Sequence, residues 1–214
     1  MPSLTIMGMC STDRKSETEL LVRTEAEKLS FLHPQTSVVE IQSESGKFFH
    51  SMNKFCIERL HLAFQTDFVL TVQFDGRILN PKAWMNDFFN YDYIGAPWGD
   101  KVVGNGGFSL RSRKLCEFVA KHYAEEYNKN YFKWVCKNPL GNEDLFICRI
   151  CKSELERNGF KFAPYGVAIK FSVEHGEYVG QLGAHHSIVF QGRLYNLKQM
   201  SEVDFKYLFQ KTSV

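Results

Sequence analysis

Apolar side chains follow two different patterns in the first third of the chain. Residues 4–9, 37–41 and 68–72 are short apolar runs with the length of strands buried in a sheet. Residues 16–29 and 49–64 instead repeat their apolar side chains along one helical face. Because strands alternate here with helices, the pattern predicts an α/β fold with a central, mostly parallel mixed sheet flanked by helices.

The rest of the chain has a weaker pattern and many aromatic and turn residues. We expect helices at 81–89, 112–127, 142–159 and 201–210, a strand at 108–110, one or two short strands within 160–173, and a loop or strand at 178–189. No repeat, low-complexity segment or linker interrupts the sequence, so we expect one domain.

Bulk composition excludes several classes of protein. The 214 residues are 44% hydrophobic and include 19 Phe, which suits a sizeable core and argues against disorder. A formal net charge of +2 lacks the strong basic field of a nucleic-acid-binding protein, so we expect no nucleic-acid partner. The N-terminus does not read as a signal peptide, and no long apolar run predicts a transmembrane segment. Cysteines without a secretion signal indicate free thiols, and we expect a cytoplasmic protein.

The apolar run at 68–72 ends in the sequence Gln73-Phe74-Asp75-Gly76. In open α/β sheets, ligands bind at the carboxyl ends of the strands, and Gly76 lets the chain turn sharply at this point. A carboxylate placed there can hold a divalent cation whose other ligands are diphosphate oxygens and water. It can equally well cap the turn, and the stretch alone does not decide between the two.

This strand end resembles the acidic triplet of the GT-A class of nucleotide-sugar glycosyltransferases, with Gln73 in place of the first acidic residue. The segments YDYIGAPW, VGNGGFSLRSRKL and GNEDLFICR together resemble a GT-A-like family found in microbes and large viruses. The chain is also similar to the N-terminal glycosyltransferase domain encoded by chlorella viruses, which implies the host cytoplasm for a viral protein. The resemblance implies a single GT-A-like domain over residues 1–214, with a nucleotide-binding half at about 1–80 and an acceptor and catalytic half at about 81–214.

The resemblance also implies a Mn²⁺ or Mg²⁺ cofactor and two protein ligands for it. The last aspartate of the triplet is the dependable metal ligand in the GT-A class, and Asp75 matches it. A histidine near the C-terminus often closes the metal site, and the position of His185 after Gly183 matches that pattern. Imidazole suits Mn²⁺ better than Mg²⁺. The neighbouring His186 would point elsewhere, because adjacent side chains on a strand lie on opposite faces.

Glu143 and Asp144 open the helix expected at 142–159, where the positive helix end stabilises ionised carboxylates. From the sequence pattern alone, this is ordinary compensation of the helix dipole. The resemblance implies that the pair faces the donor sugar. Asp144 would then be the base that takes the proton of the acceptor hydroxyl in an inverting reaction, and Glu143 would bind acceptor hydroxyls.

The glycines of the V-G-N-G-G segment leave room for close approach to the backbone, which a tight turn would also explain. In a glycosyltransferase we expect the donor sugar there, and we expect Trp98 to offer a flat apolar face to a sugar of the acceptor, unless it is a core side chain. The residues expected to bind nucleotide and donor are Ser11, Thr12, Arg14, Lys54, Arg59, Gln73, Asn105, Gly106 and Gly107.

The function expected from these residues is the metal-dependent transfer of a sugar from a nucleotide diphosphate sugar to a glycan hydroxyl. The resemblance implies a UDP-sugar as the donor, because UDP is the commonest carrier in that class. Two alternatives stay open. A nucleotidyltransferase shares the scaffold but usually needs several carboxylates for two metal ions. A non-catalytic glycan-binding module on a decayed transferase scaffold would explain Gln73 in place of an acid. The sequence also leaves open whether the chain is part of a longer multidomain polypeptide.

Overall fold

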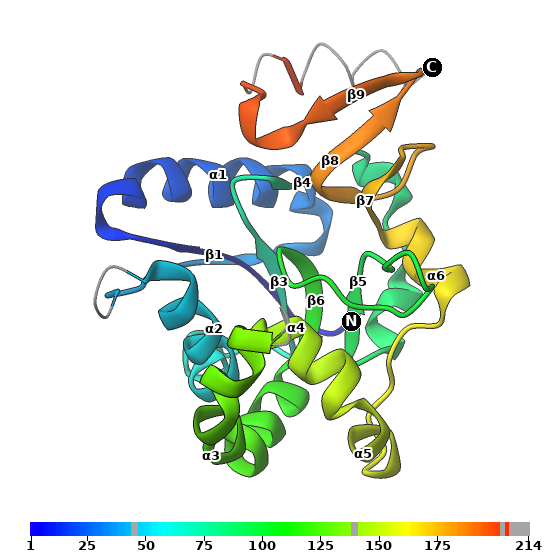
Figure 1. Cartoon of the computed structure of the whole chain (residues 1–214). Coiled ribbons are helices and arrows are strands. Elements are labelled where there is room, and N and C mark those ends of the chain that lie inside the picture. The colour runs from blue at the N-terminus through cyan, green and yellow to red at the C-terminus, as the bar shows by residue number, and fades with distance from the viewer. Residues whose placement is uncertain (44–46, 138–140, 202–203, 206–214) are drawn as a thin grey trace.

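The computed structural model describes residues 1–43, 47–137, 141–201 and 204–205, with the backbone alone at 131–137. Its main sheet has five strands in the order β2 (Gln35–Glu40), β1 (Leu4–Cys10), β3 (Phe68–Val72), β6 (Phe108–Ser112) and β5 (Tyr93–Gly95). β1 pairs in parallel with β2 and β3, while β6 runs antiparallel to β3 and β5. The expected α/β fold with a mixed central sheet is thereby confirmed (Figure 1).

Helices cover both faces of the main sheet. α1 (Lys15–Lys28) and α6 (Tyr165–Phe171) pack on the face that carries Leu4 and Ile6. The opposite face carries Met7 and Val69 and packs against the segment after α2 (Phe48–Glu58) and against α3 (Arg113–Lys137). The side chains of β1 alternate between the two faces as strand geometry requires, and all seven of its residues are buried, so the strand is covered on both sides.

A second, smaller sheet adjoins the main one. It consists of β4 (Gly76–Ile78), β8 (Gly183–Phe190) and β7 (Ser172–Glu177) in that order, and β9 (Arg193–Asn196) pairs with β8. β4 follows β3 after only three residues, so Asp75 lies where the chain passes from one sheet to the other.

A buried glutamate of α1 fixes the position of β4. Glu25 is fully buried, and its Oε2 accepts the Ile78 N–H at 2.7 Å. Its Oε1 pairs with the Lys28 ammonium at 2.7 Å. Because a buried carboxylate is costly without such partners, these contacts hold α1 against the strand that leads away from Asp75.

Several expected elements differ in the structure. Residues 81–89 form two 3-10 turns, Pro81–Ala83 and Asn86–Asn90, because Trp84 and Met85 between them are extended. The helix expected at 49–64 ends at Glu58 and is followed by a 3-10 turn. The helix expected at 142–159 is divided into α4 (Glu143–Leu145), a π-helical turn and α5 (Lys152–Arg157).

The C-terminal region brings one further correction. Strands were expected within 160–173, but α6 occupies half of that range, and β7 begins only at Ser172. The segment at 178–189, left open between loop and strand, contains most of β8. Most of the helix expected at 201–210 lies outside the described residues. Within the described part of the chain, no helix is both long and apolar enough to span a membrane.

Candidate functional site

Three polar side chains form a row across the small sheet. His185 on β8 is in register with Gly76 of β4 on one side and with Glu174 of β7 on the other. The backbone N–H of His186 donates to the carbonyl of Asp75 at 2.8 Å, which fixes Asp75 beside β8. Pairing of strands that are about 100 residues apart in the chain therefore places Glu174, His185 and Asp75 side by side.

The two facing atoms of this row lack hydrogen bonds. Asp75 Oδ1 and His185 Nε2 lie 3.4 Å apart, and both are buried without a hydrogen-bond partner among the described residues. On the other side of the ring, His185 Nδ1 lies 2.9 Å from Glu174 Oε1. A proton on Nδ1 donated to Glu174 would leave the lone pair of Nε2 directed toward Asp75. Metal-binding histidines are commonly oriented by a carboxylate in this way.

The charges of the row are mutually dependent. Burial lowers the pKa of His185, but the interactions of its ring with the Asp75 and Glu174 carboxylates outweigh this effect and raise the pKa to about 9. Burial raises the pKa of Asp75 and of Glu174, and the same histidine more than offsets it, so both carboxyls have a lowered pKa. In the protein alone, an imidazolium therefore compensates two carboxylates in this pocket.

A divalent cation fits between Asp75 and His185. Ligand atoms on neighbouring corners of an octahedron with bonds of about 2.1 Å lie about 3 Å apart, close to the separation seen here. The opposite wall is Gly107, where a Cβ atom would lie 2.0 Å from His185 Nε2, so a side chain at this position would fill the space. Within the described residues, no three His, Cys, Asp or Glu side chains are grouped to hold a metal ion. The remaining ligands of a cation held here would have to come from substrate and water.

Protein side chains occupy the space beside each glycine of the 104–107 loop. A Cβ at Gly104 would lie 1.9 Å from the Trp98 ring, and one at Gly106 would lie 2.1 Å from Glu143 Oε1. Gly107 is approached by His185 in the same way. The expectation that Gly106 and Gly107 leave room for the donor sugar is therefore corrected. Because these glycines have no side chains, the loop packs directly against Trp98, Glu143 and His185.

Asn105 is also used inside the protein. It is buried in the left-handed region at φ 57°, and its Oδ1 accepts the Phe108 N–H at 3.3 Å. Its Nδ2 lies 2.9 Å from His185 Nδ1 and also hydrogen-bonds the Glu174 carboxylate. The expected hydrogen bond to a donor sugar hydroxyl does not fit this burial. Asn105 is instead a positioning residue that holds His185 and Glu174 together.

Asp144 lies on the other side of the same loop. Its Oδ2 accepts the Gly106 N–H at 2.8 Å, and its Oδ1 accepts the N–H of Leu145 in its own helix at 2.7 Å. The surrounding protein and the charge of Glu143 raise the pKa of Asp144 to about 7, although the two N–H donors act in the opposite direction. The side chain is only partly buried. A partly buried carboxyl with a pKa near neutrality suits a general base.

Glu143 does not have the exposure that an acceptor ligand requires. It is 5% exposed, and its Oε1 accepts a hydrogen bond of 2.7 Å from Arg111, which is itself 1% exposed. Arg111 also donates to Ser109 and lies over the Tyr93 ring at 5.1 Å from its centroid. The role expected for Glu143 is therefore corrected: it neutralises a buried guanidinium beneath the loop that carries Gly106.

This structural role predicts a loss of stability. Glu143→Gln should lower the free energy of unfolding by about 3–5 kcal/mol, because the substitution leaves Arg111 as a buried charge without its counter-charge. Glu117→Gln is the matched control, since Glu117 forms an exposed pair with Arg113 of the same length, 2.7 Å. The control should change stability by about 0.5 kcal/mol or less. Equal urea denaturation midpoints for the two variants would show that the buried pair has no structural role.

In the loop after β1, Arg14 lies close to Phe74, the residue before Asp75. The Arg14 guanidinium carbon lies 4.9 Å from the centroid of the Phe74 ring, next to Asp75 in the chain. Lys198, which the sequence did not point to, lies with its ammonium 5.1 Å from the same ring. Two cations thus border the strand end. Thr12 is exposed and donates to Glu40 at 2.7 Å, and Ser11 precedes the 3-10 turn that carries Arg14.

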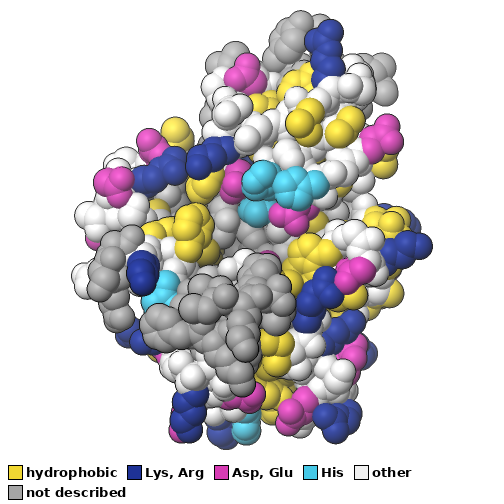
Figure 2. All heavy atoms as spheres, in the orientation of Figure 1, with side chains coloured by type: hydrophobic (Ala, Val, Ile, Leu, Met, Phe, Trp, Pro, Cys, Tyr) yellow, Lys and Arg dark blue, Asp and Glu magenta, His cyan; other side chains and the backbone are white. Residues whose placement is uncertain are grey.

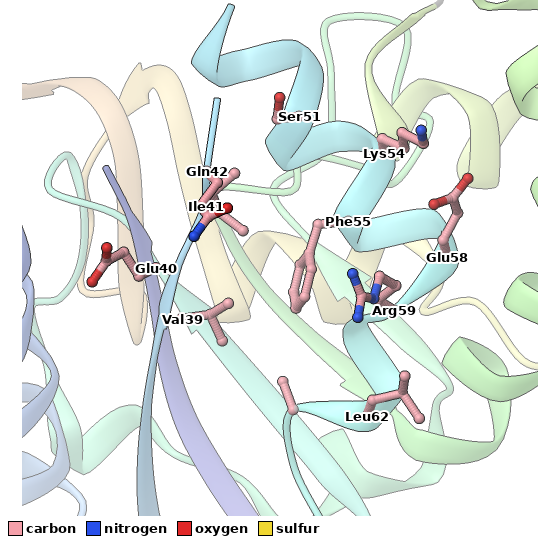
Figure 3. A pocket seen from close by; sticks show the side chains of 11 residues that line it. Val39, Glu40, Ile41, Gln42, Ser51, Lys54, Phe55, Glu58, Arg59 and Leu62 are labelled. Atoms are coloured by element: carbon pink, nitrogen blue, oxygen red, sulfur yellow. The ribbon is translucent and has the colours of Figure 1, made fainter. Parts of the chain in front are cut away.

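Two of the expected nucleotide ligands lie in a separate hollow. Lys54 and Arg59 line a cavity of about 540 Å³ between α2 and the outer strand β2, together with Glu58 (Figure 3). Neither Asp75 nor Asp144 lines this hollow. The expectation that one or both of these cations face a diphosphate held at Asp75 is therefore not supported. Gln73 is half-buried, with its Nε2 3.7 Å from the sulfur of Met52.

Trp98 lies between the site and the surface. Its ring packs against Gly104, and the Arg149 guanidinium carbon lies 4.7 Å from its centroid. Arg149 in turn pairs with Asp100 at 2.7 Å. The ring is therefore partly covered by protein groups, and what it offers to a ligand is the part that lines a further hollow.

A search of curated protein sequences finds no significant relative of the chain. Among solved structures, a match is the crystal structure of a glycosyltransferase involved in the glycosylation of the major capsid of PBCV-1, at 19% identity and a TM-score of 0.46. The match covers 72% of this chain and 78% of that chain, and a likeness of this size carries no information about activity. Residues 35–187 match the model of a family described as "Protein of unknown function (DUF5672)", and this segment contains Asp75, Asp144 and His185. The chain therefore belongs to the DUF5672 family.

Proposed function

We propose that the protein is a metal-dependent glycosyltransferase of the GT-A type that moves a sugar from a UDP-sugar to a glycan hydroxyl with inversion. The observation that carries this proposal is the buried pair Asp75 Oδ1 and His185 Nε2, which lie 3.4 Å apart at the carboxyl end of β3 and make no hydrogen bond to other described residues. Both atoms are of the kind that binds a divalent cation, and a cation between them would replace the imidazolium proton that pairs them in the protein alone.

The cations beside Phe74 support a diphosphate next to the metal. Arg14 and Lys198 come from the two ends of the chain and meet at the ring that precedes Asp75. Both side chains are exposed, and among the described residues Arg14 is paired only with the exposed Glu17, so neither cation would have to leave a buried ion pair to bind a phosphate oxygen. The metal would supply charge neutralisation for the leaving diphosphate. Arg14 and Lys198 would bind the phosphate oxygens that face solvent.

One short loop contacts both the proposed base and the proposed metal site. The Gly106 N–H donates a hydrogen bond to Asp144, and the next residue, Gly107, lies against His185. In an inverting transfer, Asp144 would accept the proton of the acceptor hydroxyl as the oxygen attacks the anomeric carbon. The proton ends on Asp144, and the bonding electrons of the broken bond leave with the nucleoside diphosphate.

The test is release of nucleoside diphosphate from a panel of sugar nucleotides in the presence of MnCl₂. Release above the rate without protein, dependent on Mn²⁺ and stimulated by a saccharide acceptor, is the expected result. Isothermal titration of UDP with and without Mn²⁺ provides a second readout, in which tight binding should require the metal. A protein that neither turns over any donor nor binds UDP in a metal-dependent way would contradict the proposal.

One observation favours a second candidate. Gln73 stands where a first acidic residue would be, and its amide lies close to the sulfur of Met52. A scaffold that has lost catalysis but still binds glycans would tolerate this substitution. In the same panel, such a module would bind saccharide and release no nucleotide from any donor.

A further inference from the structure

A hollow of about 460 Å³ lies beside the metal row on the side of α6 and β7. Its walls come from the loop after β5, from α6 and from β7. Figure 2 shows a cluster of histidine side chains bordering a depression of this face, with acidic and hydrophobic side chains close below them. On the small sheet, ring contacts at 4.5 Å and 6.3 Å join His186 to His175 and to His185. Of these, His175 lines the hollow.

The hollow shares walls with the proposed reaction centre. Glu174 lines it and also accepts the hydrogen bond from His185, whose other ring nitrogen faces Asp75. Trp98 lines it and packs on Gly104, two residues before the Gly106 N–H that binds Asp144. A molecule held in the hollow would therefore lie beside both the metal row and the loop whose Gly106 N–H binds the proposed base.

The groups in the hollow are those that recognise a sugar. Tyr165 is 42% exposed and presents an aromatic ring, and the Lys101 ammonium lies 5.6 Å from its centroid. Glu177 adds a hydrogen-bond acceptor, and His175 adds a further polar group. Aromatic rings stack on the apolar face of a pyranose, while a few placed polar groups orient its hydroxyls.

One buried hydroxyl in this wall has no partner. Ser172 is 1% exposed and lines the hollow, and its Oγ makes no hydrogen bond within the described residues. A buried hydroxyl without a partner carries a desolvation cost that a ligand hydroxyl can relieve. This observation is independent of the aromatic lining and points to a ligand with hydroxyl groups.

We infer that this hollow is the acceptor subsite and that it holds a neutral saccharide ring against Tyr165, with a hydroxyl toward Ser172. This inference rests on the proposed function, which makes a saccharide bound here the acceptor of the transferred sugar. Lys101 and Glu177 bring one charge of each sign, and Glu174 is already paired with His185 at 2.9 Å, so the lining as a whole favours no strongly charged ligand. The acceptor thus enters between α6 and β7, on a side of the site different from that of Arg14 and Lys198.

Binding of simple saccharides tests the assignment directly. The probes are the methyl glycosides of glucose, galactose, mannose, xylose, fucose and rhamnose, observed by saturation-transfer NMR with UDP and MnCl₂ present. At least one should bind to the wild-type protein, and Tyr165→Ala should weaken that binding about tenfold or more, equivalent to about 1.4 kcal/mol. Ser172→Ala should weaken it as well without lowering the unfolding midpoint, because the substitution removes an unpartnered group. Phe31→Ala, a change of an exposed aromatic residue outside the hollow, is the control.

The two proposals fail in different ways. If no glycoside binds to the wild-type protein, or if Tyr165→Ala and Phe31→Ala bind it equally, the acceptor subsite is wrong even if UDP binds with Mn²⁺. If a glycoside binds in the hollow and Tyr165→Ala weakens it, but UDP binding never depends on Mn²⁺, the subsite stands and the metal-dependent transferase is wrong. Titration of Mn²⁺ into Tyr165→Ala should give the wild-type affinity, since Tyr165 does not contact the row.

Discussion

Asp75→Asn is expected to abolish detectable Mn²⁺ binding and to lower turnover about 10³-fold. The substitution keeps the size of the side chain and removes the charge that a hard cation requires. Loss of the metal would remove several kcal/mol of charge stabilisation from the leaving diphosphate, and about 4 kcal/mol corresponds to three orders of magnitude in rate. Mn²⁺ binding is measured by electron paramagnetic resonance of the free ion, and turnover by nucleoside diphosphate release.

Asp87→Asn is the matched control, because Asp87 is an exposed carboxylate in the 3-10 turn Asn86–Asn90. Gly107→Ala tests the same site with the carboxylate in place. Its Cβ would lie 2.0 Å from His185 Nε2, so it should weaken Mn²⁺ binding by obstructing the second ligand. Wild-type turnover and Mn²⁺ affinity in a folded Asp75→Asn protein would remove the basis of the proposed function.

The scaffold could be predicted from the sequence because its signals are local. The strand at 68–72 was expected with the bounds that the structure gives, since five apolar residues followed by a turn sequence leave few alternatives. β1 and α1 agree for the same reason. The direction of β6 could not be predicted, because the apolar pattern of a buried strand does not record whether its neighbour runs parallel or antiparallel.

The row of Asp75, His185 and Glu174 could be predicted only in part from the sequence. Asp75 and His185 were singled out through a resemblance, and Glu174 was not. It stands in a strand that begins one residue after α6, in a segment of mixed polar and apolar residues. Its part in the site depends on its register with His185, which strand pairing decides and local sequence does not. Lys198 was missed for the same reason, since only the path of the chain after β9 brings it to Phe74.

For the glycine-rich loop, the sequence predicted a close contact but not the group that makes it. The sequence revealed that something approaches the backbone at Gly104, Gly106 and Gly107, and this is correct. It did not reveal what approaches, and the structure shows protein side chains in place of the expected ligand. Similarly, the acidic pair at 143–144 was recognised as a unit, but neighbouring residues on a helix point in different directions. One faces a buried arginine and the other the loop.

Asp144→Asn is expected to lower kcat by about 10²–10⁴-fold while leaving Mn²⁺ binding intact. The amide cannot accept a proton from the acceptor hydroxyl. It can still accept one backbone N–H, so the loop at Gly106 should keep its place. Asp87→Asn again serves as the control for loss of a carboxylate. Turnover within threefold of the wild-type rate would show that another group, or solvent, is the base.

The pH dependence follows from the same carboxyl. Because the pKa of Asp144 is raised to about 7, the base is mostly protonated below that pH and mostly ionised above it. The wild-type rate at low substrate concentration should therefore rise about tenfold per pH unit below pH 7 and level off above it. The residual activity of Asp144→Asn should lack this rise, and an unchanged rise in the variant would assign the ionisation to another group.

Stability supplies a readout that does not require a substrate. A carboxyl whose pKa is higher in the folded state than its ordinary 3.8 favours folding fully at pH values below 3.8, and this contribution is lost as pH rises toward about 7. The unfolding free energy of the wild-type protein should thus decline relative to that of Asp144→Asn between about pH 4 and pH 7. Urea denaturation of both proteins across this range measures the difference. A constant difference would mean that Asp144 titrates normally in the fold, and the case for it as a base poised near neutrality would then rest on its position beside Gly106 alone.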